Sequence, residues 1–387
     1  MNHRKIFNAV IMVTGTSVGS GILGLPIITS RAGLLPTMLA FLVAWVFMTV
    51  AAFYILDVKL QIKGPHNLSS LIKRTLGRPG QVVSSLMIVS LLYALLCTYM
   101  MAGSAWLNVF IEPLMVIPGH LAPILFTLIL GGLLLCGERF TYNLNNLLGI
   151  ALLFAFTATV GSSLVPANYD FIKQGEFQAI LPSLPLILST FGFSIVVPAL
   201  TEYLDYDAKS VKKAIIIGSL LALLAYVVWE WVTLGNISPS SFQTMRLSGD
   251  NGTGVIVSLA HSTHSSSVTF SGQLFAVFAV ITSFLGVSLA LLHFLSDVMS
   301  LKLKGENKFV LFFMTYLPPI IVTSFYPKAF VQILSFAGIF VAVLLGLFPA
   351  MMVFKSKRKW SSRFIIIAVI VFFGLAIAQE ILNLRYI

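Results

Sequence analysis

The stretch VTGTSVGSGILGLP, residues 13–26, lies inside an apolar run that is otherwise typical of a membrane helix. It carries four glycines and one proline, namely Gly15, Gly19, Gly21, Gly24 and Pro26. Glycine weakens a helix, and proline removes a backbone donor. In hydrocarbon, each freed backbone group costs several kcal/mol unless another group satisfies it. The stretch therefore predicts a membrane helix broken where it lines a buried cavity, as at the binding sites of transporters.

The composition fixes the class of protein. The chain is 58% hydrophobic and only 10% charged, whereas a soluble domain carries about 25% charged residues. A polytopic membrane protein is the class that this composition indicates. The net charge of +11 invites a nucleic-acid partner, but the distribution of the charges favours membrane topology instead. We expect a lipid bilayer as the surroundings and no nucleic-acid partner.

Eleven apolar stretches have the length of a membrane span, about 20 residues. They are residues 6–30, 35–58, 81–110, 121–138, 144–165, 183–205, 212–235, 271–300, 308–325, 328–354 and 363–384. Of the 24 Lys and Arg residues, 19 fall at the N-terminus and in the loops after even-numbered spans. Basic loops stay in the cytoplasm. We therefore predict a cytoplasmic N-terminus and, with an odd number of spans, a C-terminus on the opposite side.

The organisation suggests two halves. Span 6 repeats the interruption of span 1, because Gly192 lies in its middle and Pro198 follows six residues later. Two interrupted helices, five spans apart and of opposite direction, are typical of an inverted-repeat transporter. The prediction is one all-α transporter domain with a 5+5 inverted repeat. Residues 1–165 would form the first repeat, 183–354 the second, and 363–384 an additional span.

Three short motifs could suggest an enzyme or a metal site. GTSVG, residues 15–19, matches the nucleophile elbow G-x-S-x-G, and GSGILG, residues 19–24, matches the dinucleotide fingerprint G-x-G-x-x-G. Both motifs need a strand, a turn and a helix in a soluble α/β sheet, which these flanks exclude. His261 and His264 lie in an outer loop with no third ligand nearby. We expect no enzyme activity, no cofactor and no metal centre.

Five segments, taken in order over nearly the whole chain, resemble one family, the hydroxy/aromatic amino acid permeases of the amino acid–polyamine–organocation superfamily. They are GTSVGSGILGLP (15–26), TFGF (190–193), AYVVWEWVTLG (225–235), TSFLGVSL (282–289) and LPP…FYPKAF (317–330). The resemblance implies a LeuT-type fold and proton-coupled uptake of tyrosine or tryptophan across the bacterial inner membrane. The C-terminus would then be periplasmic.

The helix breaks predict the substrate site. An amino acid zwitterion needs partners for both charges at the middle of the bilayer. The second half of span 1 begins near Gly19, Ser20 and Gly21, and its free N–H groups should hold the carboxylate. The first half of span 6 ends near Thr190, and its carbonyls should face the ammonium group. The full predicted set is Gly15, Thr16, Gly19, Ser20, Gly21, Ser189, Thr190, Phe191, Gly192, Phe193 and Ser194, with Tyr93 from span 3.

Within this set, Phe191 and Phe193 could meet an aromatic ring edge-to-face, and Tyr93 could supply a hydroxyl. Which of Tyr, Trp or Phe is the substrate stays open, because the partner of a ring hydroxyl or indole N–H cannot be identified. Ser194 stands where the resemblance would place a histidine in close relatives of the tyrosine permeases.

The coupling ion is open between H⁺ and Na⁺. Thr282 and Ser283 match positions that form a sodium site in sodium-coupled members of this fold. Some proton-coupled relatives place a lysine of span 5 there instead, but Leu152 occupies that point in this chain. Glu230 in span 7 is an acid within the membrane, and such a residue is a candidate proton carrier. A structural role for Glu230 is the alternative.

The predicted function is import of an aromatic amino acid, driven by a cation gradient. A sodium-coupled carrier, a symporter of a small neutral amino acid, and a sensor that retains the fold without moving solute remain alternatives. No feature of the sequence indicates an obligate protein partner.

Overall fold

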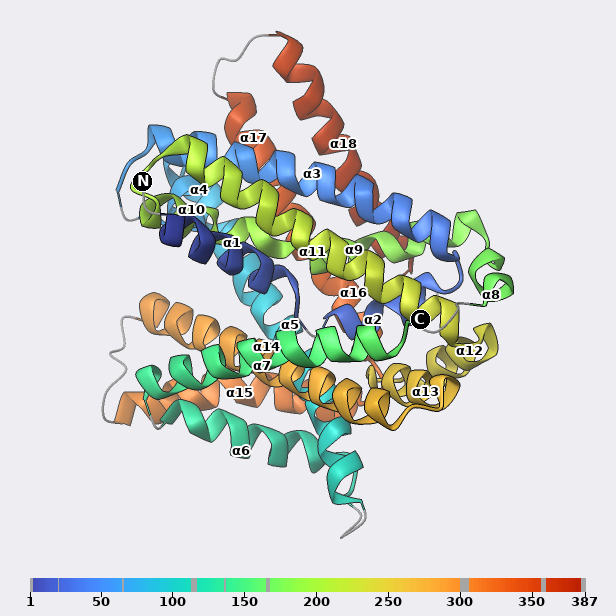
Figure 1. The fold of residues 1–387 in the computed structure, drawn as a ribbon. Coiled ribbons are helices and arrows are strands. Elements are labelled where there is room, and N and C mark those ends of the chain that lie inside the picture. The colour runs from blue at the N-terminus through green and yellow to red at the C-terminus, as the bar shows by residue number, and fades with distance from the viewer. Residues whose placement is uncertain are drawn as a thin grey trace.

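The protein is described by a computed structural model that covers residues 3–19, 21–64, 66–112, 117–135, 137–164, 168–299, 306–355 and 360–383. Ser20, one of the predicted site residues, lies outside these ranges. The described residues form helices and no strand, as the composition predicts (Figure 1).

The helices run in the following order. They are α1 (His3–Ser17), α2 (Gly21–Thr29), α3 (Leu34–Gln61), α4 (Leu68–Leu76), α5 (Arg78–Ile111), α6 (Ala122–Leu135), α7 (Glu138–Ser162), α8 (Tyr169–Lys173), η1 (Phe177–Ser183), α9 (Leu184–Thr190), η2 (Gly192–Val196), α10 (Val197–Tyr203), α11 (Ala208–Asn236), α12 (Pro239–Ser248), α13 (Thr253–Thr263), α14 (Ser266–Met299), α15 (Glu306–Phe325), α16 (Phe330–Val341), η3 (Ala342–Leu347), α17 (Phe348–Lys355) and α18 (Trp360–Asn383).

In the described part of the chain, nine helices are long and apolar enough to cross a membrane. The bent pair α1 and α2 adds a tenth if the pair is counted as one span. The remaining predicted span, residues 121–138, is α6, which has only 14 residues. At 1.5 Å per residue, it is about 21 Å long, shorter than the hydrocarbon core of about 30 Å. The chain is thus a multi-pass membrane protein, and the count of eleven rests on α6.

Both predicted interruptions are present. The axes of α1 and α2 differ by 51° across a break between Ser17 and Gly21. In span 6, α9 ends at Thr190, the 3₁₀ turn η2 follows, and α10 begins at Val197 with Pro198 in its first turn. The first turn of a helix tolerates proline because its N–H groups have no partner inside the helix. The glycines and this proline therefore act as the sequence predicts.

Span 7 supports the first half of span 1. Helix α11 packs along α1, where Gly218 leaves room for a close approach. A Cβ atom at Gly218 would lie 2.6 Å from the Cβ atom of Val13 and 2.8 Å from the carbonyl oxygen of Val10. The Thr14 hydroxyl also donates to the Gly218 carbonyl at 3.0 Å. Helices α1 and α11 are therefore held together through backbone contacts.

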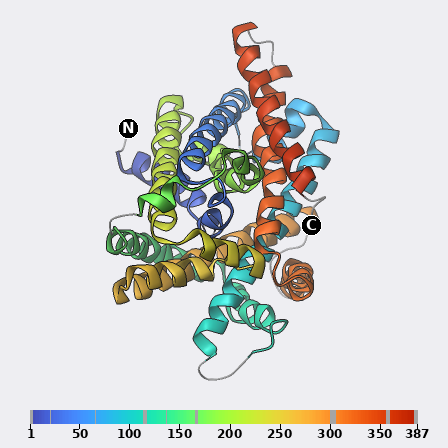
Figure 2. The same ribbon diagram turned by 90° about the vertical axis from the view of Figure 1, so that its right-hand side faces the viewer.

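Other spans surround the two broken ones. Helix α16 packs on α9, where the α carbon of Gly338 comes so close to the Pro185 carbonyl that no Cβ atom would fit. Helix α14 packs along α7 and α5 (Figures 1 and 2). The α1/α2 break and the α9/η2 break thus lie between the α11, α14 and α16 helices, where a substrate site was predicted.

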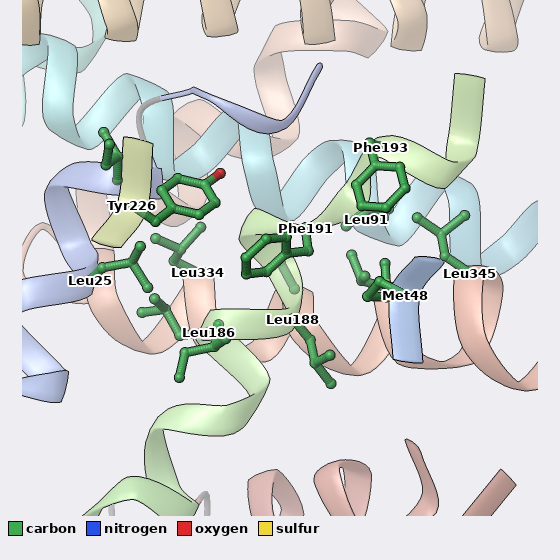
Figure 3. Packing of buried hydrophobic residues seen from close by; sticks show 14 of the residues in the cluster. Leu25, Met48, Leu91, Leu186, Leu188, Phe191, Phe193, Tyr226, Leu334 and Leu345 are labelled. Atoms are coloured by element: carbon green, nitrogen blue, oxygen red, sulfur yellow. The ribbon is translucent and has the colours of Figure 1, made fainter. Parts of the chain in front are cut away.

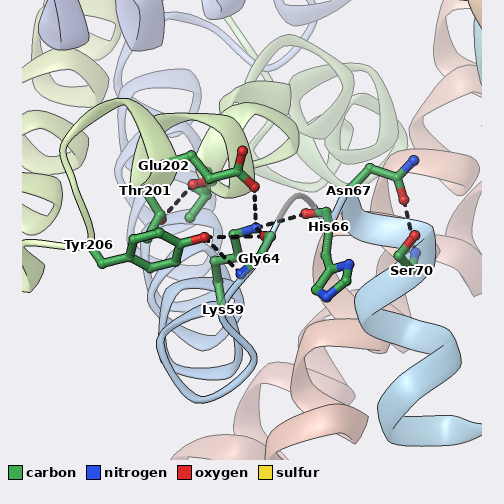
Figure 4. Close-up of polar contacts among 9 residues, drawn as sticks. Lys59, Gly64, His66, Asn67, Ser70, Thr201, Glu202 and Tyr206 are labelled. Carbon is green, nitrogen blue, oxygen red and sulfur yellow. Dashed lines mark hydrogen bonds and ion pairs between the residues drawn. The ribbon is translucent and has the colours of Figure 1, made fainter.

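A polar cluster joins α3 to α10 at the end of the bundle where α1 begins (Figure 4). Lys59 is fully buried, and its ammonium group donates to the Gly64 carbonyl at 2.6 Å and the His66 carbonyl at 3.1 Å, and it pairs with Glu202. The Gly64 N–H donates to the hydroxyl of Tyr206 at 2.9 Å. A buried ammonium ion needs such a full set of partners. The pair of Lys59 and Glu202 ties the second half of span 6 to span 2.

Candidate substrate and ion site at the two helix breaks

The two breaks expose backbone groups of opposite kind. Helix α1 ends at Ser17 and α9 ends at Thr190, so the last carbonyls of both helices lack donors within their own helix. Helix α2 begins at Gly21, and the N–H groups of its first turn lack acceptors within the helix; that of Ile22 donates to the Gly19 carbonyl at 3.2 Å. The aligned peptide dipoles make the carbonyl ends negative and the N–H end positive. These are the groups that a zwitterion needs.

The breaks are in direct contact with each other and with α14. A Cβ atom at Gly21 would lie 3.1 Å from the Thr190 methyl group, and one at Gly19 would lie 2.9 Å from the Ser283 hydroxyl. The structure therefore brings Gly19, Gly21, Thr190 and Ser283 together. The side chain of Thr282 donates within its own helix, to the Phe278 carbonyl at 2.7 Å.

Tyr226 of α11 is a residue of this region that the sequence prediction missed. Its hydroxyl oxygen lies 2.6 Å from the carbonyl oxygen of Ser17 and 2.8 Å from that of Thr190. It thus bridges the last carbonyl of α1 and the last carbonyl of α9, and the side chain is completely buried. The only sequence signal was a tyrosine one turn before Glu230, which does not by itself point to the breaks.

The two phenylalanines of span 6 differ in their surroundings. The Phe191 ring meets the Tyr226 ring edge-on, with centroids 5.1 Å apart, and it also contacts Phe41 of α3 at 6.3 Å. Figure 3 shows Phe193 on the side of Phe191 away from Tyr226, near Met48. Both phenylalanines are fully buried. Phe191 therefore belongs to the wall beside the breaks, whereas Phe193 packs toward α3.

Four other predicted residues of span 6 lie in or next to its break, and two of them donate their hydroxyl groups to carbonyls of their own helix. Ser189 donates to the Leu186 carbonyl at 2.7 Å, and Thr190 donates to the Ile187 carbonyl at the same distance. Both bonds lie within α9. The Ser194 hydroxyl is buried and has no partner among the described residues. Gly192 is partly buried, with Leu345 4.0 Å from where its Cβ atom would be.

Three predicted residues point elsewhere. Gly15 and Thr16 are exposed on α1, and the Thr16 hydroxyl donates to the Met12 carbonyl at 2.6 Å. The Tyr93 hydroxyl donates to the Met314 carbonyl of α15 at 2.7 Å. The structure therefore does not bring the Tyr93 hydroxyl to the breaks.

Glu230 lies at the far end of α2 from Ser283. Its Oε2 atom is 3.0 Å from the Thr29 hydroxyl, which also lies 2.8 Å from the Leu25 carbonyl oxygen. The side chain is completely buried, and Oε1 has no partner among the described residues. Eight residues of helix separate Gly21 from Thr29, about 12 Å along the axis. The two candidate ion sites are thus separate.

The same end of α2 is held from outside the spans. Arg246 of α12 donates to the Ile27 carbonyl at 3.0 Å and to the Ser30 hydroxyl at 2.6 Å. A cation at a helix C-terminus is favourable because the dipole is negative there. Burial lowers the pKa of Arg246 below its usual value. This contact gives the segment 236–270 a structural role.

An apolar crevice of about 140 Å³ lies between α5, α6 and α14, with Trp106, Phe126 and Ile281 in its wall. None of its lining residues belongs to the breaks, and its wall offers no polar surface. A zwitterion needs polar partners, so this crevice is unsuited to an amino acid.

Comparison with known proteins identifies the family of the chain. The model of the tryptophan/tyrosine permease family matches residues 2–381. The chain belongs to this family. Membership makes the protein a transporter and not an enzyme, so the enzyme-like motifs of residues 15–24 are incidental.

Curated relatives cover almost the full length. The chain is 26% identical to a tyrosine-specific transport system of Haemophilus influenzae, over 92% of this chain and 89% of that protein. It is 27% identical to a tryptophan-specific transport protein of Shigella flexneri, over 92% and 88%. A glutamine transporter of Aliivibrio fischeri is 24% identical, over 92% and 90%.

A solved manganese transporter of Eremococcus coleocola has a similar fold. The TM-score is 0.60 at 17% identity, and the match covers 97% of this permease and 85% of that chain. At this identity, the likeness concerns the fold alone.

Proposed function

We propose that this permease imports an aromatic amino acid into the cytoplasm by secondary active transport. The observation that carries the proposal is that two broken spans meet. A Cβ atom placed on Gly21, at the start of α2, would lie 3.1 Å from the methyl group of Thr190, at the end of α9. The named relatives that transport tyrosine or tryptophan support the substrate class.

In this proposal the helix ends receive the two charges of the substrate. The carboxylate would accept from the first N–H groups of α2, near Gly19, Ser20 and Gly21. The ammonium group would donate to the carbonyls that end α9. No charged side chain is needed at either end, and glycine permits close approach of the ligand to the backbone. Phe191 would form part of the wall for the aromatic ring.

We propose H⁺ as the coupling ion and Glu230 as its carrier. An ionised carboxylate that is fully buried with a single donor is costly. A neutral acid fits the observed contacts better. It can donate from Oε2 to the Thr29 hydroxyl while that hydroxyl donates to Leu25, so both short distances are satisfied at once.

The topology belongs to the same proposal. Counting α6 as a span and each broken pair as one gives eleven spans, with a LeuT-type 5+5 repeat over residues 1–165 and 183–354 and a further span at 363–384. The interrupted spans are first and sixth in this count, as that arrangement requires. The N-terminus would lie in the cytoplasm and the C-terminus in the periplasm of a bacterial inner membrane.

Uptake into proteoliposomes tests the function. Purified protein is reconstituted, and radiolabelled Tyr, Trp, Phe, Ser, Ala and Gln are offered with and without imposed H⁺ or Na⁺ gradients. Saturable uptake of one or more aromatic amino acids, driven by a pH gradient, is the expected result. Uptake of Ser, Ala or Gln without the aromatic amino acids would contradict the substrate class.

A second candidate is transport of a neutral, non-aromatic amino acid. The relative that carries the name glutamine transporter matches over 92% of this chain at an identity near that of the tyrosine and tryptophan transporters. The helix ends would serve any zwitterion, so only the side-chain pocket distinguishes the two candidates. The same uptake panel separates them.

Sodium coupling is the alternative for the ion, because Ser283 lies against Gly19 at the break of span 1. The double variant Thr282→Ala with Ser283→Ala removes both hydroxyls. Under proton coupling we expect its uptake to remain independent of Na⁺. If Na⁺ drives uptake in the unsubstituted protein and the double variant loses this uptake, the sodium site is established instead.

A further inference from the structure

One hydroxyl group faces two carbonyl groups that both need a donor. The Tyr226 oxygen lies within 2.8 Å of the carbonyl oxygens of Ser17 and Thr190. A tyrosine hydroxyl carries a single proton, so it donates to only one of them at a time. A buried acceptor without a donor costs about 1–3 kcal/mol. Among the described residues, the single proton of Tyr226 therefore serves only one of the two helix ends at a time.

The packing of its ring holds the Tyr226 hydroxyl in place between the two carbonyls. Its ring is packed edge-on against Phe191, and it contacts Phe41 with centroids 6.0 Å apart. Its exposed fraction is 0%. The ring therefore fixes the hydroxyl between the two carbonyls.

The carbonyl that Tyr226 does not serve favours a donor of definite chemistry. Both carbonyls are the last of their helices, where the peptide dipoles leave a partial negative charge. A group with positive charge and several N–H donors fits this place, and a primary ammonium has three.

We propose that Tyr226 is a positioning residue for recognition of the substrate ammonium group: its proton satisfies one helix end and leaves the other for the ammonium. This inference rests on the proposed amino acid transport and adds to it a residue that discriminates ligands with an amine from ligands without one. The carboxylate and the ring of a substrate would be held elsewhere, by α2 and by the aromatic wall.

Two substitutions separate this role from simple packing. Tyr226→Phe removes the hydroxyl and keeps the ring. Tyr226→4-aminophenylalanine, introduced by nonsense suppression, supplies two N–H protons. These can satisfy both carbonyls, so that neither carbonyl is left for the substrate. Tyr93→Phe is the matched control, because it removes another tyrosine hydroxyl that donates to a main-chain carbonyl, between α5 and α15.

The readout is a ratio of affinities. Inhibition of uptake is measured for an amino acid that the unsubstituted protein transports and for its des-amino analogue, a 3-substituted propionate. A neutral hydrogen bond contributes about 0.5–1.5 kcal/mol. We therefore expect the 4-aminophenylalanine variant to bind the amino acid about 3- to 10-fold more weakly, with the analogue changed less than about twofold. Tyr226→Phe leaves both carbonyls open to the ammonium group, so it should bind the amino acid no more weakly than the unsubstituted protein does. The Tyr93 control should leave the ratio unchanged.

Opposite outcomes overturn the inference. Equal weakening of both ligands by the 4-aminophenylalanine variant, or an affinity for the amino acid that this variant leaves unchanged or raises, would show that the hydroxyl only packs. Weaker binding of the amino acid by Tyr226→Phe would show that the hydroxyl only ties the helices. The 4-aminophenylalanine variant keeps the ties, so it decides the question if Tyr226→Phe does not fold. Failure of the unsubstituted protein to take up any amino acid would overturn the proposed function itself.

Discussion

The close approach of α1 and α11 can be tested at Gly218. Substitution by alanine places a Cβ atom 2.6 Å from the Val13 Cβ atom and 2.8 Å from the Val10 carbonyl oxygen. Carbon atoms in contact lie about 3.5–4.0 Å apart. Because the second contact is to backbone, rotation of a side chain cannot relieve it. Helix α1 must move away from α11 by about 1 Å.

Such overpacking costs about 1–3 kcal/mol. The alanine also gains up to about 1 kcal/mol of helix propensity. Gly374→Ala in α18 serves as the control for that gain, since no atom lies within 4 Å of its added Cβ position. The difference between the two variants should therefore equal the cost of the clash. The shift of α1 also lengthens the 2.6 Å contact between Tyr226 and the Ser17 carbonyl.

The assay combines thermal unfolding in detergent with initial rates of uptake. Gly218→Ala should unfold at a lower temperature than Gly374→Ala, and its Vmax/KM should fall because the Ser17 carbonyl moves away from Tyr226. Val13→Gly removes the Cβ atom that clashes first. In a double-mutant cycle, it should therefore show a favourable coupling with Gly218→Ala of about 1 kcal/mol. Unfolding and uptake equal to those of the control, with no coupling, would refute the reasoning.

Three further substitutions are expected to have specific effects. Gly21→Leu should abolish uptake while the protein still inserts, because a side chain would meet Thr190 and fill the proposed carboxylate site; normal transport would contradict that assignment. Glu230→Gln should make uptake insensitive to pH, whereas an unaltered pH profile would leave Glu230 a structural role. Asp207→Asn tests the N-cap of α11. The Ser210 hydroxyl, which donates to Asp207 at 2.7 Å, lowers the pKa of that carboxyl below 3.8. Its stabilisation is therefore present above pH 3.8 and lost as the pH falls through the lowered pKa. Thermal unfolding should show that the advantage of the unsubstituted protein over Asp207→Asn shrinks on acidification; a constant difference would count against the interaction.

The sequence predicted those features that follow from local backbone chemistry. The breaks near Gly19 and Gly192 were predictable because glycine and proline free backbone groups wherever they fall in a span. The family was predictable from five ordered segments, and the family match confirms it. The helical class followed from the composition.

Contacts between distant segments were not predictable. Tyr226 and Ser17 are 209 residues apart, and nothing in their local sequence states that one hydroxyl reaches the carbonyl of the other. The Tyr93 hydroxyl was expected near the substrate, but packing directs it to Met314. Each of these depends on tertiary packing.

Helix α11 touches the first span at three levels: Gly218 beside α1, Tyr226 at the break and Glu230 at the end of α2. These three residues are spaced 8 and 4 positions apart, so the regular rise of the helix sets the levels about 12 Å and 6 Å apart. One inserted residue between Gly218 and Tyr226 would turn the two later side chains by about 100° and misalign both with their partners. The spacing within α11 should therefore tolerate substitution far better than it tolerates insertion or deletion.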